Sequence, residues 1–301
     1  MSEKTIAITG AGGFIGKYLL DELSADSSVK VKALTRKETA GYADTDRLRW
    51  VSADYSEAGL CEIFSGVDTV VHMAGTKGNK TELSDFDSDL EMTENILKAM
   101  GRCGVGKIIY ASSRLVYGNP ETVPWKEEYT PDPRMAYAVN KVRCEELCRK
   151  YSSQYGFSAD VIRIAQVLGK GEGTRTMINV FQDLAAAGSS LKVIGKSVAK
   201  RQYVYAGDVA RVIHILAAGS EDSAAERPGF SIINVGMERG YTNLEIAEMI
   251  NRAFQNEAPI IYDDTNPETI TDSIMDITVL KEKTGLTPLD MEQALKMMNS
   301  H

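Results

Sequence analysis

A glycine-rich turn between an apolar strand and a helix constrains the fold of this chain more than any other feature. Residues 4–9 read as a buried strand, TGAGGFIG follows at 9–16, and a helix is expected over 16–24. Glycines in this pattern allow a tight turn, a close approach of the backbone to a pyrophosphate, and close packing of the helix on the strand. Free N–H groups at the helix N-terminus favour phosphates. The sequence therefore predicts a dinucleotide-binding turn formed by Gly10, Gly12, Gly13, Phe14, Ile15 and Gly16.

Apolar strands and amphipathic helices alternate along the first two thirds of the chain. Strands are expected at 4–9, 29–35, 48–51, 68–72, 107–112, 159–164 and 232–235, and helices at 16–24, 82–103 and 135–155. This alternation predicts a parallel sheet with helices on both faces. Because crossovers between parallel strands are right-handed, the expected fold class is α/β, a doubly wound parallel sheet of the Rossmann type.

The alternation weakens after residue 168, where glycine-rich loops and shorter elements follow. Thr242 and Glu245 form a capping-box pattern that begins a helix. We expect a smaller C-terminal α/β substrate lid, with substrate in the cleft between the two parts. The expected ranges are a Rossmann domain over 1–168, rejoined by about 203–236, and a lid over 169–202 and 237–301.

Composition restricts the partners of the chain. Its 301 residues carry a net charge of −8, which argues against nucleic acid as a partner. Neither a signal-peptide pattern nor an apolar run long enough for a bilayer is present in the sequence, so no membrane association and a cytoplasmic location are expected. The four cysteines and three histidines lack the spacing of a metal site, so no metal is expected.

Tyr137 and Lys141 lie four residues apart on an expected helix and so share one face. A free phenol has a pKa near ~10 and is a poor base at neutral pH. An ammonium group nearby favours the phenolate, which makes a tyrosine usable as an acid and base. The pair is therefore a candidate catalytic centre.

Residues that follow the second, third and fourth strands are candidates for the adenosine half of the cofactor. Arg36 stands where NAD-binding proteins often carry an acid for the ribose, and its fork favours the 2′-phosphate of NADP. Alternatively, Arg36 stacks on adenine with NAD bound. Asp54, with Tyr55 beside it, is placed to accept from the adenine amino group, and Ala74 and Gly75 are small enough for the cofactor to pass.

Together these segments resemble one family, the extended short-chain dehydrogenase/reductases of the NAD-dependent epimerase/dehydratase type. The resemblance extends from residue 4 to the end of the chain. Its motifs are TGAGGFIG at 9–16, Asp54, VVHMAG at 70–75, SSRLVYG at 112–118, YAVNK at 137–141, RQYVYAGDVA at 201–210 and INVG at 233–236.

The resemblance implies a role for each matching residue. Tyr137 is the acid/base, Lys141 lowers its pKa and holds the nicotinamide ribose, and Ser113 hydrogen-bonds the reacting sugar oxygen. Ser112 is the alternative to Ser113, since adjacent strand residues face opposite ways. Family members usually bind nucleotide sugars, and Arg201 matches the arginine that grips the diphosphate. Asn179 lies in the segment that commonly borders the nucleotide base.

Two departures from the family pattern concern the substrate. The chain has QVLG at 166–169 where relatives often carry an asparagine, and 265–276 contains no arginine, although many relatives have a second phosphate-binding arginine there. Dehydratases carry an Asp-Glu pair directly after the catalytic Ser/Thr. Arg114 and Leu115 occupy those places here, which argues against a 4,6-dehydratase.

We interpret the chain as an NAD(P)-dependent nucleotide-sugar epimerase, similar to UDP-hexose 4-epimerases, with Tyr137 as acid/base. An NADPH-dependent nucleotide-sugar 4-keto reductase is the alternative, because Ser113, Tyr137 and Lys141 suffice for it too. A non-catalytic dinucleotide-sensing regulator is a minor alternative. In this family the two long helices pair across a two-fold axis, so a homodimer is expected. Its seam could be formed by Met92, Ile96, Ala99 and Met100, although packing within the chain explains these residues equally well.

Overall fold

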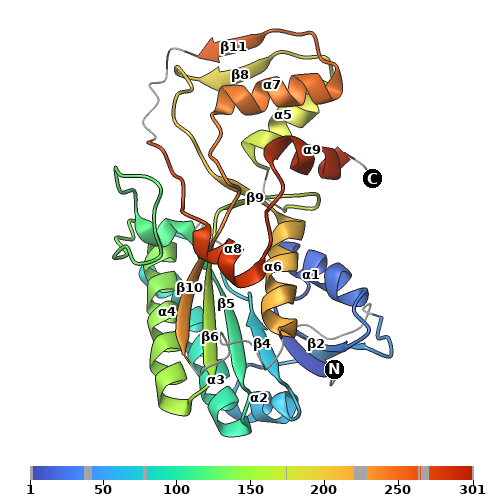
Figure 1. Ribbon diagram of the computed structural model, residues 1–301, viewed down its shortest axis with the longest axis vertical. Helices are drawn as coiled ribbons and strands as arrows, with labels where there is room; N and C mark the ends of the chain where they lie inside the picture. The colour runs from blue at the N-terminus through green and yellow to red at the C-terminus, as the bar shows by residue number, and fades with distance from the viewer. Residues whose placement is uncertain are drawn as a thin grey trace.

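Seven parallel strands form the central sheet (Figure 1), in the order β10-β6-β5-β4-β1-β2-β3. The computed structural model describes residues 3–36, 43–76, 80–173, 175–219, 229–263, 265 and 271–299. The strands are β1 (Lys4–Thr9), β2 (Val29–Thr35), β3 (Leu48–Ser52), β4 (Thr69–His72), β5 (Lys107–Ser113), β6 (Ser158–Ile164) and β10 (Phe230–Val235). The order reverses between β1 and β4, which is where ligands bind in such sheets. The predicted doubly wound parallel sheet is confirmed.

Helices cover both faces of the sheet because its strands are apolar on both sides. Helices α1 (Phe14–Ser24) and α6 (Ala206–Ala218) pack together on one face, where Ile6 and Ile8 of β1 lie. The other face, where Ala7 lies, carries α2 (Glu57–Phe64), α3 (Asp87–Cys103) and α4 (Ala136–Tyr155). Alternate residues of one strand thus belong to two separate cores.

The expected and observed elements differ by one or two residues at several ends, and more clearly at two places. The helix expected over 82–103 begins with a 3₁₀ turn, η1 (Leu83–Phe86), before α3, and the Phe86 side chain is buried there. Helix α2 was not predicted from the sequence. It is only eight residues long, and the hydroxyl of Ser56 caps its N-terminus by accepting from Gly59 N. The strand expected at 232–235 does rejoin the sheet, as β10 beside β6.

The C-terminal part builds a second, smaller layer that Figure 1 shows above the central sheet. Parallel strands β8 (Leu191–Ile194) and β11 (Ile260–Asp263) form its small sheet. Its core contains residues of α5 (Met177–Ala186), α7 (Asn243–Phe254) and α9 (Met291–Asn299). A further pair, β7 (Gln166–Leu168) with β9 (Tyr203–Tyr205), connects it to the main sheet. The predicted domain boundaries stay a prediction.

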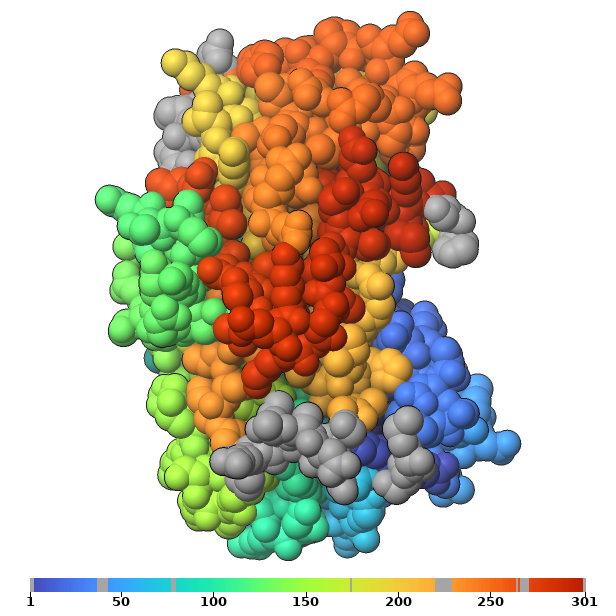
Figure 2. Space-filling model, in the orientation of Figure 1, coloured from blue at the N-terminus to red at the C-terminus, as the bar shows by residue number. Residues whose placement is uncertain are grey.

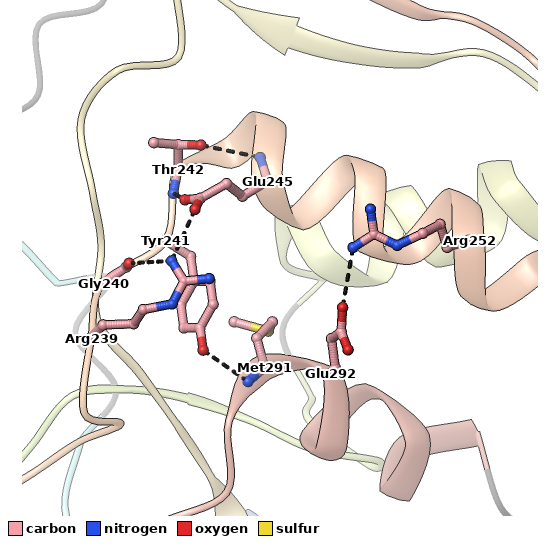
Figure 3. Close-up of polar contacts among 8 residues, drawn as sticks. All are labelled: Arg239, Gly240, Tyr241, Thr242, Glu245, Arg252, Met291 and Glu292. Carbon is pink, nitrogen blue, oxygen red and sulfur yellow. Dashed lines mark hydrogen bonds and ion pairs between the residues drawn. The ribbon is translucent and has the colours of Figure 1, made fainter.

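Polar contacts hold the helices of this small layer together (Figure 3). The hydroxyl of Thr242 accepts from Glu245 N, and Glu245 accepts from Thr242 N, which is the predicted capping box. The hydroxyl of Tyr241 accepts from Met291 N at 3.2 Å. An ion pair of 3.1 Å between Arg252 and Glu292 joins α7 to α9.

The chain returns from this layer to the main sheet before it ends. Helix α8 (Thr278–Thr284) packs against β10 and α6, and Leu280 is part of the core on that face. In Figure 2 the red surface of the C-terminal residues lies across the middle of the molecule, between the two layers. Residues near the C-terminus therefore contact both layers.

A buried ion pair connects the centre of the sheet to α4. Arg163 of β6 and Glu145 of α4 are 1% and 3% exposed, and Arg163 Nη2 donates to Glu145 Oε2 at 2.7 Å. Glu145 Oε1 also accepts from Arg163 Nε at 3.2 Å and from Ser112 Oγ at 2.5 Å. Burial alone lowers the pKa of Arg163, but the hydrogen bonds and charge of Glu145 outweigh it and raise the pKa. Arg163 thus stays charged.

The four residues predicted to form a dimer seam are buried in the core of this chain. Met92, Ile96, Ala99 and Met100 are all part of the core beneath α3. They therefore give no support for a partner, and the homodimer stays a prediction. None of the described helices is long and apolar enough to span a bilayer. The described residues also contain no cluster of three or more His, Cys, Asp or Glu side chains suited to a metal.

Replacing Glu145 with glutamine is expected to lower the free energy of unfolding by about 3–5 kcal/mol, because Arg163 would remain buried without its carboxylate. Urea denaturation measures the loss. The matched control is Glu146→Gln on the same helix, where the ion pair to Arg149 is exposed, and its cost should stay below about 1 kcal/mol. Equal losses in the two variants would contradict the assigned importance of the buried pair.

Candidate active site

The glycine-rich turn has the geometry that a dinucleotide phosphate group requires. Gly10 has a φ of +74°, and a Cβ there would lie 2.8 Å from Ala74 N. A Cβ on Gly16 would lie 2.4 Å from the carbonyl oxygens of Gly10 and Ala11. Gly13 is the N-cap of α1 and brings no side chain to cap it. The first N–H groups of α1 are therefore left for an anionic ligand.

The candidate catalytic residues lie against the same turn. A cavity of 270 Å³ is lined by Ser113 at the end of β5, by Tyr137 and Lys141 of α4, and by Gly10, Gly13, Phe14, Ile15 and Gly16. Gly12 of the predicted turn is exposed and does not line this cavity. The sheet order explains why Ser113 lies near the glycine-rich turn. Parallel strands have their carboxyl ends at one edge of the sheet, and only β4 separates β5 from β1.

Lys141 is held by the end of β5. Its Nζ donates to the carbonyl oxygen of Ala111 at 2.8 Å and lies 5.7 Å from the centre of the Tyr137 ring. The side chain is buried, and its Nζ also lies 4.9 Å from the ring centre of Tyr110. The ammonium group of Lys141 thus lies beside the Tyr137 ring at the end of β5.

The two serines at the end of β5 have different surroundings. Ser112 is buried, and its hydroxyl donates to Glu145. The Ser113 hydroxyl accepts from Leu115 N at 3.3 Å, and the residue is more exposed than Ser112. An accepting hydroxyl still has its own proton to donate, so Ser113 can hydrogen-bond a ligand oxygen.

A buried histidine holds the strand ends beside the glycine-rich turn. His72 Nδ1 lies 2.7 Å from Thr9 Oγ1, and Nε2 lies 3.0 Å from Thr93 Oγ1. Thr9 Oγ1 also accepts from the backbone N–H groups of Met73 and Ala74. Burial, with a contribution from the charge of Lys141, lowers the pKa of His72 to about 3. The ring is therefore neutral.

Three of the residues assigned to the adenosine half line a second cavity, of 350 Å³. Arg36, Asp54 and Tyr55 belong to it, together with Asp89 and Glu91 of α3. Ala74 and Gly75 line neither this cavity nor the first. They lie between the two, because Ala74 meets Gly10 and a Cβ on Gly75 would lie 3.4 Å from Asp89 Oδ2.

Each of these side chains has a distinct environment. The Asp54 carboxylate accepts from Ser56 N and Ser56 Oγ, and these hydrogen bonds hold its pKa below the usual value. Burial raises the pKa of Tyr55 to about 12, so its hydroxyl stays protonated. Asp89 accepts from Thr76 N at 2.6 Å. Arg36 is exposed at the end of β2.

The two substrate candidates lie in the C-terminal part. The Asn179 side-chain oxygen accepts from Thr176 N at 3.0 Å and completes the capping box of α5. This leaves its amide nitrogen as the group available to a base. Arg201 pairs through its backbone with Tyr241 and with Ser273, and its side chain is partly exposed.

Sequence reasoning missed three buried polar residues, Glu145, Arg163 and Gln202. Glu145 and Arg163 were not singled out, although a charged residue in the middle of the apolar strand DVIRI needs a buried partner. Gln202 is fully buried, donates to the carbonyl oxygens of Met237 and Met275, and accepts from Met275 N. The contacts of Gln202 could not be predicted from the sequence, because its partners are distant along the chain.

Comparison with known proteins finds similar sequences. The model of the NAD dependent epimerase/dehydratase family matches residues 6–236. A putative UDP-glucose 4-epimerase of Methanocaldococcus jannaschii is 26% identical, over 97% of this chain and 96% of the relative. A dTDP-4-dehydro-6-deoxy-D-allose reductase of a Streptomyces species is 27% identical, over 97% of this chain and 94% of the relative.

A solved structure is similar over almost the whole length. The crystal structure of UDP-N-acetylglucosamine 4-epimerase from Bacillus cereus matches with a TM-score of 0.84 and 28% identity. The match covers 99% of this chain and 96% of that chain. The small C-terminal layer is therefore included in the similarity.

Replacing Gly16 with alanine is expected to separate α1 from the turn, because the added Cβ would lie 2.4 Å from two carbonyl oxygens. We expect a loss of about 1–3 kcal/mol in unfolding free energy from overpacking. Dinucleotide affinity, measured by calorimetric titration, should fall at least about tenfold, which is 1.4 kcal/mol. Gly106→Ala is the control, since the nearest atom to its Cβ is 3.9 Å away. Wild-type affinity in Gly16→Ala would contradict the assigned role of the turn.

Proposed function

Because the chain belongs to the NAD dependent epimerase/dehydratase family, we propose that it interconverts the C4 epimers of a nucleotide sugar, as a UDP-hexose 4-epimerase does. The observation that carries the proposal is the single cavity lined by Ser113, Tyr137, Lys141 and the glycine-rich turn. It combines an acid/base, a hydroxyl donor and a dinucleotide phosphate site within one small volume.

The residues of the turn fit a nicotinamide dinucleotide. A side chain at Gly10 or Gly16 would collide with backbone, and the N-terminus of α1 has no side-chain cap. Gly10, Gly13 and α1 would hold the pyrophosphate, while Lys141 would contact the nicotinamide ribose. When bound, the dinucleotide supplies the acceptor, and later the donor, of the hydride at sugar C4.

Tyr137 and Ser113 act on the C4 oxygen. Tyr137 takes the hydroxyl proton as the C4 hydrogen leaves as hydride, and a 4-ketone results. It returns the proton to that oxygen when hydride is delivered to the opposite face of C4. Ser113 donates a hydrogen bond where charge develops on the oxygen, and the Lys141 ammonium stabilises the phenolate of Tyr137.

We propose the small C-terminal layer as the substrate lid, with Arg201 on the diphosphate and Asn179 at the base. A guanidinium fork matches phosphate oxygens. Relatives of this chain carry names with UDP-glucose and dTDP-sugars, so a pyrimidine nucleotide is the substrate class that the similarity supports.

The surroundings of Arg36 favour NAD over NADP as the cofactor. The sequence favoured NADP because of this arginine, but the cavity that it lines also contains the carboxylates of Asp54, Asp89 and Glu91. Three like charges near a 2′-phosphate would oppose its binding, whereas carboxylates accept hydrogen bonds from a 2′-hydroxyl. Arg36 can then stack on adenine.

Tyr137→Phe should keep dinucleotide binding and lower the interconversion of UDP-glucose and UDP-galactose by about 10²- to 10⁴-fold, the usual contribution of general acid/base catalysis. Product ratios followed by NMR measure the rate. Tyr155→Phe makes the same chemical change on an exposed part of α4 and should leave the rate unchanged. An active Tyr137→Phe protein would refute the mechanism.

Denaturing the purified protein and identifying the dinucleotide released tests the cofactor and the reaction together. We expect NAD or NADH at near one per chain, because an epimerase recycles its cofactor without releasing it. An empty protein that binds NADPH much more tightly than NADH would instead favour the 4-keto reductase.

A further inference from the structure

Arg114 follows Ser113 directly, yet the reaction described above does not use it. It begins the 3₁₀ turn η2 (Arg114–Tyr117) at the end of β5. Its Nη1 donates to Ser273 Oγ at 2.8 Å. The guanidinium therefore extends from the candidate catalytic serine toward the segment that carries Ser273.

That segment is paired with the backbone of Arg201. Gln202 N donates to Ser273 O at 3.0 Å, and Ser273 N donates to Lys200 O at 2.8 Å, which makes Arg201 and Ser273 partners in a parallel bridge. Bridge partners project their side chains on the same face of a sheet. The Arg201 side chain and the Arg114 guanidinium, bonded to Ser273, thus lie on one side.

The charges of the two arginines lie close enough to act on each other. Burial, and then the charge of Arg201, lowers the pKa of Arg114. Among the described residues, no carboxylate forms an ion pair with Arg114 or Arg201. Arg163, by contrast, is compensated by Glu145. Two partly buried like charges that have no carboxylate partner in the described part of the chain raise the free energy of the folded protein, and a bound anion would lower it.

We propose that Arg114 is a substrate-binding residue that forms, with Arg201, a subsite for anionic oxygens of the nucleotide sugar. The inference rests on the proposed function, because Ser113 places this pair beside the reacting sugar. Two planar forks suit the oxygens of a diphosphate, and a carboxylate on the sugar offers the same chemistry. Arg114 would supply the second cation that 265–276 lacks.

The test is a calorimetric titration of purified wild-type, Arg114→Gln and Arg114→Lys proteins with UDP. The Gln variant should bind UDP about 10- to 100-fold more weakly, as expected for loss of charge-assisted hydrogen bonds. The Lys variant keeps the charge but not the fork, so it should lose less. Lys200→Gln removes a charge from an exposed neighbour of Arg201 and should stay within about threefold of wild type.

Three ligands separate the two sources of the anion. Weaker binding of UDP, UDP-glucose and UDP-glucuronate alike by Arg114→Gln assigns the subsite to the phosphates. Weaker binding of UDP-glucuronate alone assigns it to a sugar carboxylate. Wild-type affinity for all three ligands in both Arg114 variants, or no binding by the wild-type protein, would overturn the proposal.

Two controls keep the result interpretable. Thermal denaturation and the amount of bound dinucleotide report whether each variant is folded, and the Lys variant remains informative should the Gln variant not fold. Binding needs no turnover, so a wild-type protein without epimerase activity but with Arg114-dependent UDP binding would refute the proposed function and leave the subsite in place.

Discussion

The ion pair between Arg163 and Glu145 joins the three elements on which the candidate catalytic residues depend. It connects β6 to α4, and Ser112 brings β5 into the same set of hydrogen bonds. Taking two charges out of water is costly unless their hydrogen bonds are satisfied. Here both carboxylate oxygens accept. Ser113 follows Ser112 and Lys141 lies one turn before Glu145, so the pair holds the end of β5, which carries Ser113, against α4, which carries Tyr137 and Lys141.

Further contacts lead from Arg163 of this ion pair toward β10, which lies at the edge of the sheet. The Arg163 guanidinium lies 4.6 Å from the centre of the Tyr117 ring, and the Tyr117 hydroxyl donates to Asn234 Oδ1 at 2.8 Å. Asn234 belongs to β10, the strand that arrives late in the chain. The Asn234 amide nitrogen in turn donates to the carbonyl oxygen of Trp125 and to that of Asp276, which lies in the segment that returns from the small layer. A continuous series of contacts between polar groups thus joins β6 to the segment that returns from the small layer.

How far the sequence predicts this molecule depends on the range of the interactions. Strands such as 4–9 and 29–35 were placed to the residue, because burial on both faces leaves a continuous apolar run. Helix α2 was not predicted, because a segment of eight residues is too short to show a clear helical periodicity of apolar residues. The motif residues of the site could also be predicted from the sequence, because their spacing along the chain is short and fixes their local geometry.

The remaining features depend on contacts between distant segments. Nothing local to Arg36 shows that Asp89 and Glu91 of α3 share its cavity. The sequence around Arg114 does not indicate its contact with Ser273. Likewise, Gln202 binds the backbone of Met237 and of Met275, which both follow β10 in the chain. A motif predicts which residue types a site holds, whereas the charge balance around it is set by the tertiary fold.

The contacts of His72 also fix where its proton resides. Thr93 Oγ1 donates to the carbonyl oxygen of Asp89 at 2.8 Å, so toward the ring it can only accept, and Nε2 must carry the hydrogen. Nδ1 is then an acceptor, and the Thr9 hydroxyl donates to it while receiving the N–H groups of Met73 and Ala74. Every hydrogen bond in the row points in one direction. The N–H groups of Met73 and Ala74, which border the glycine-rich turn, are thereby coupled to a single tautomer of His72. A second proton, on Nδ1, would make the ring and the Thr9 hydroxyl two donors that face each other.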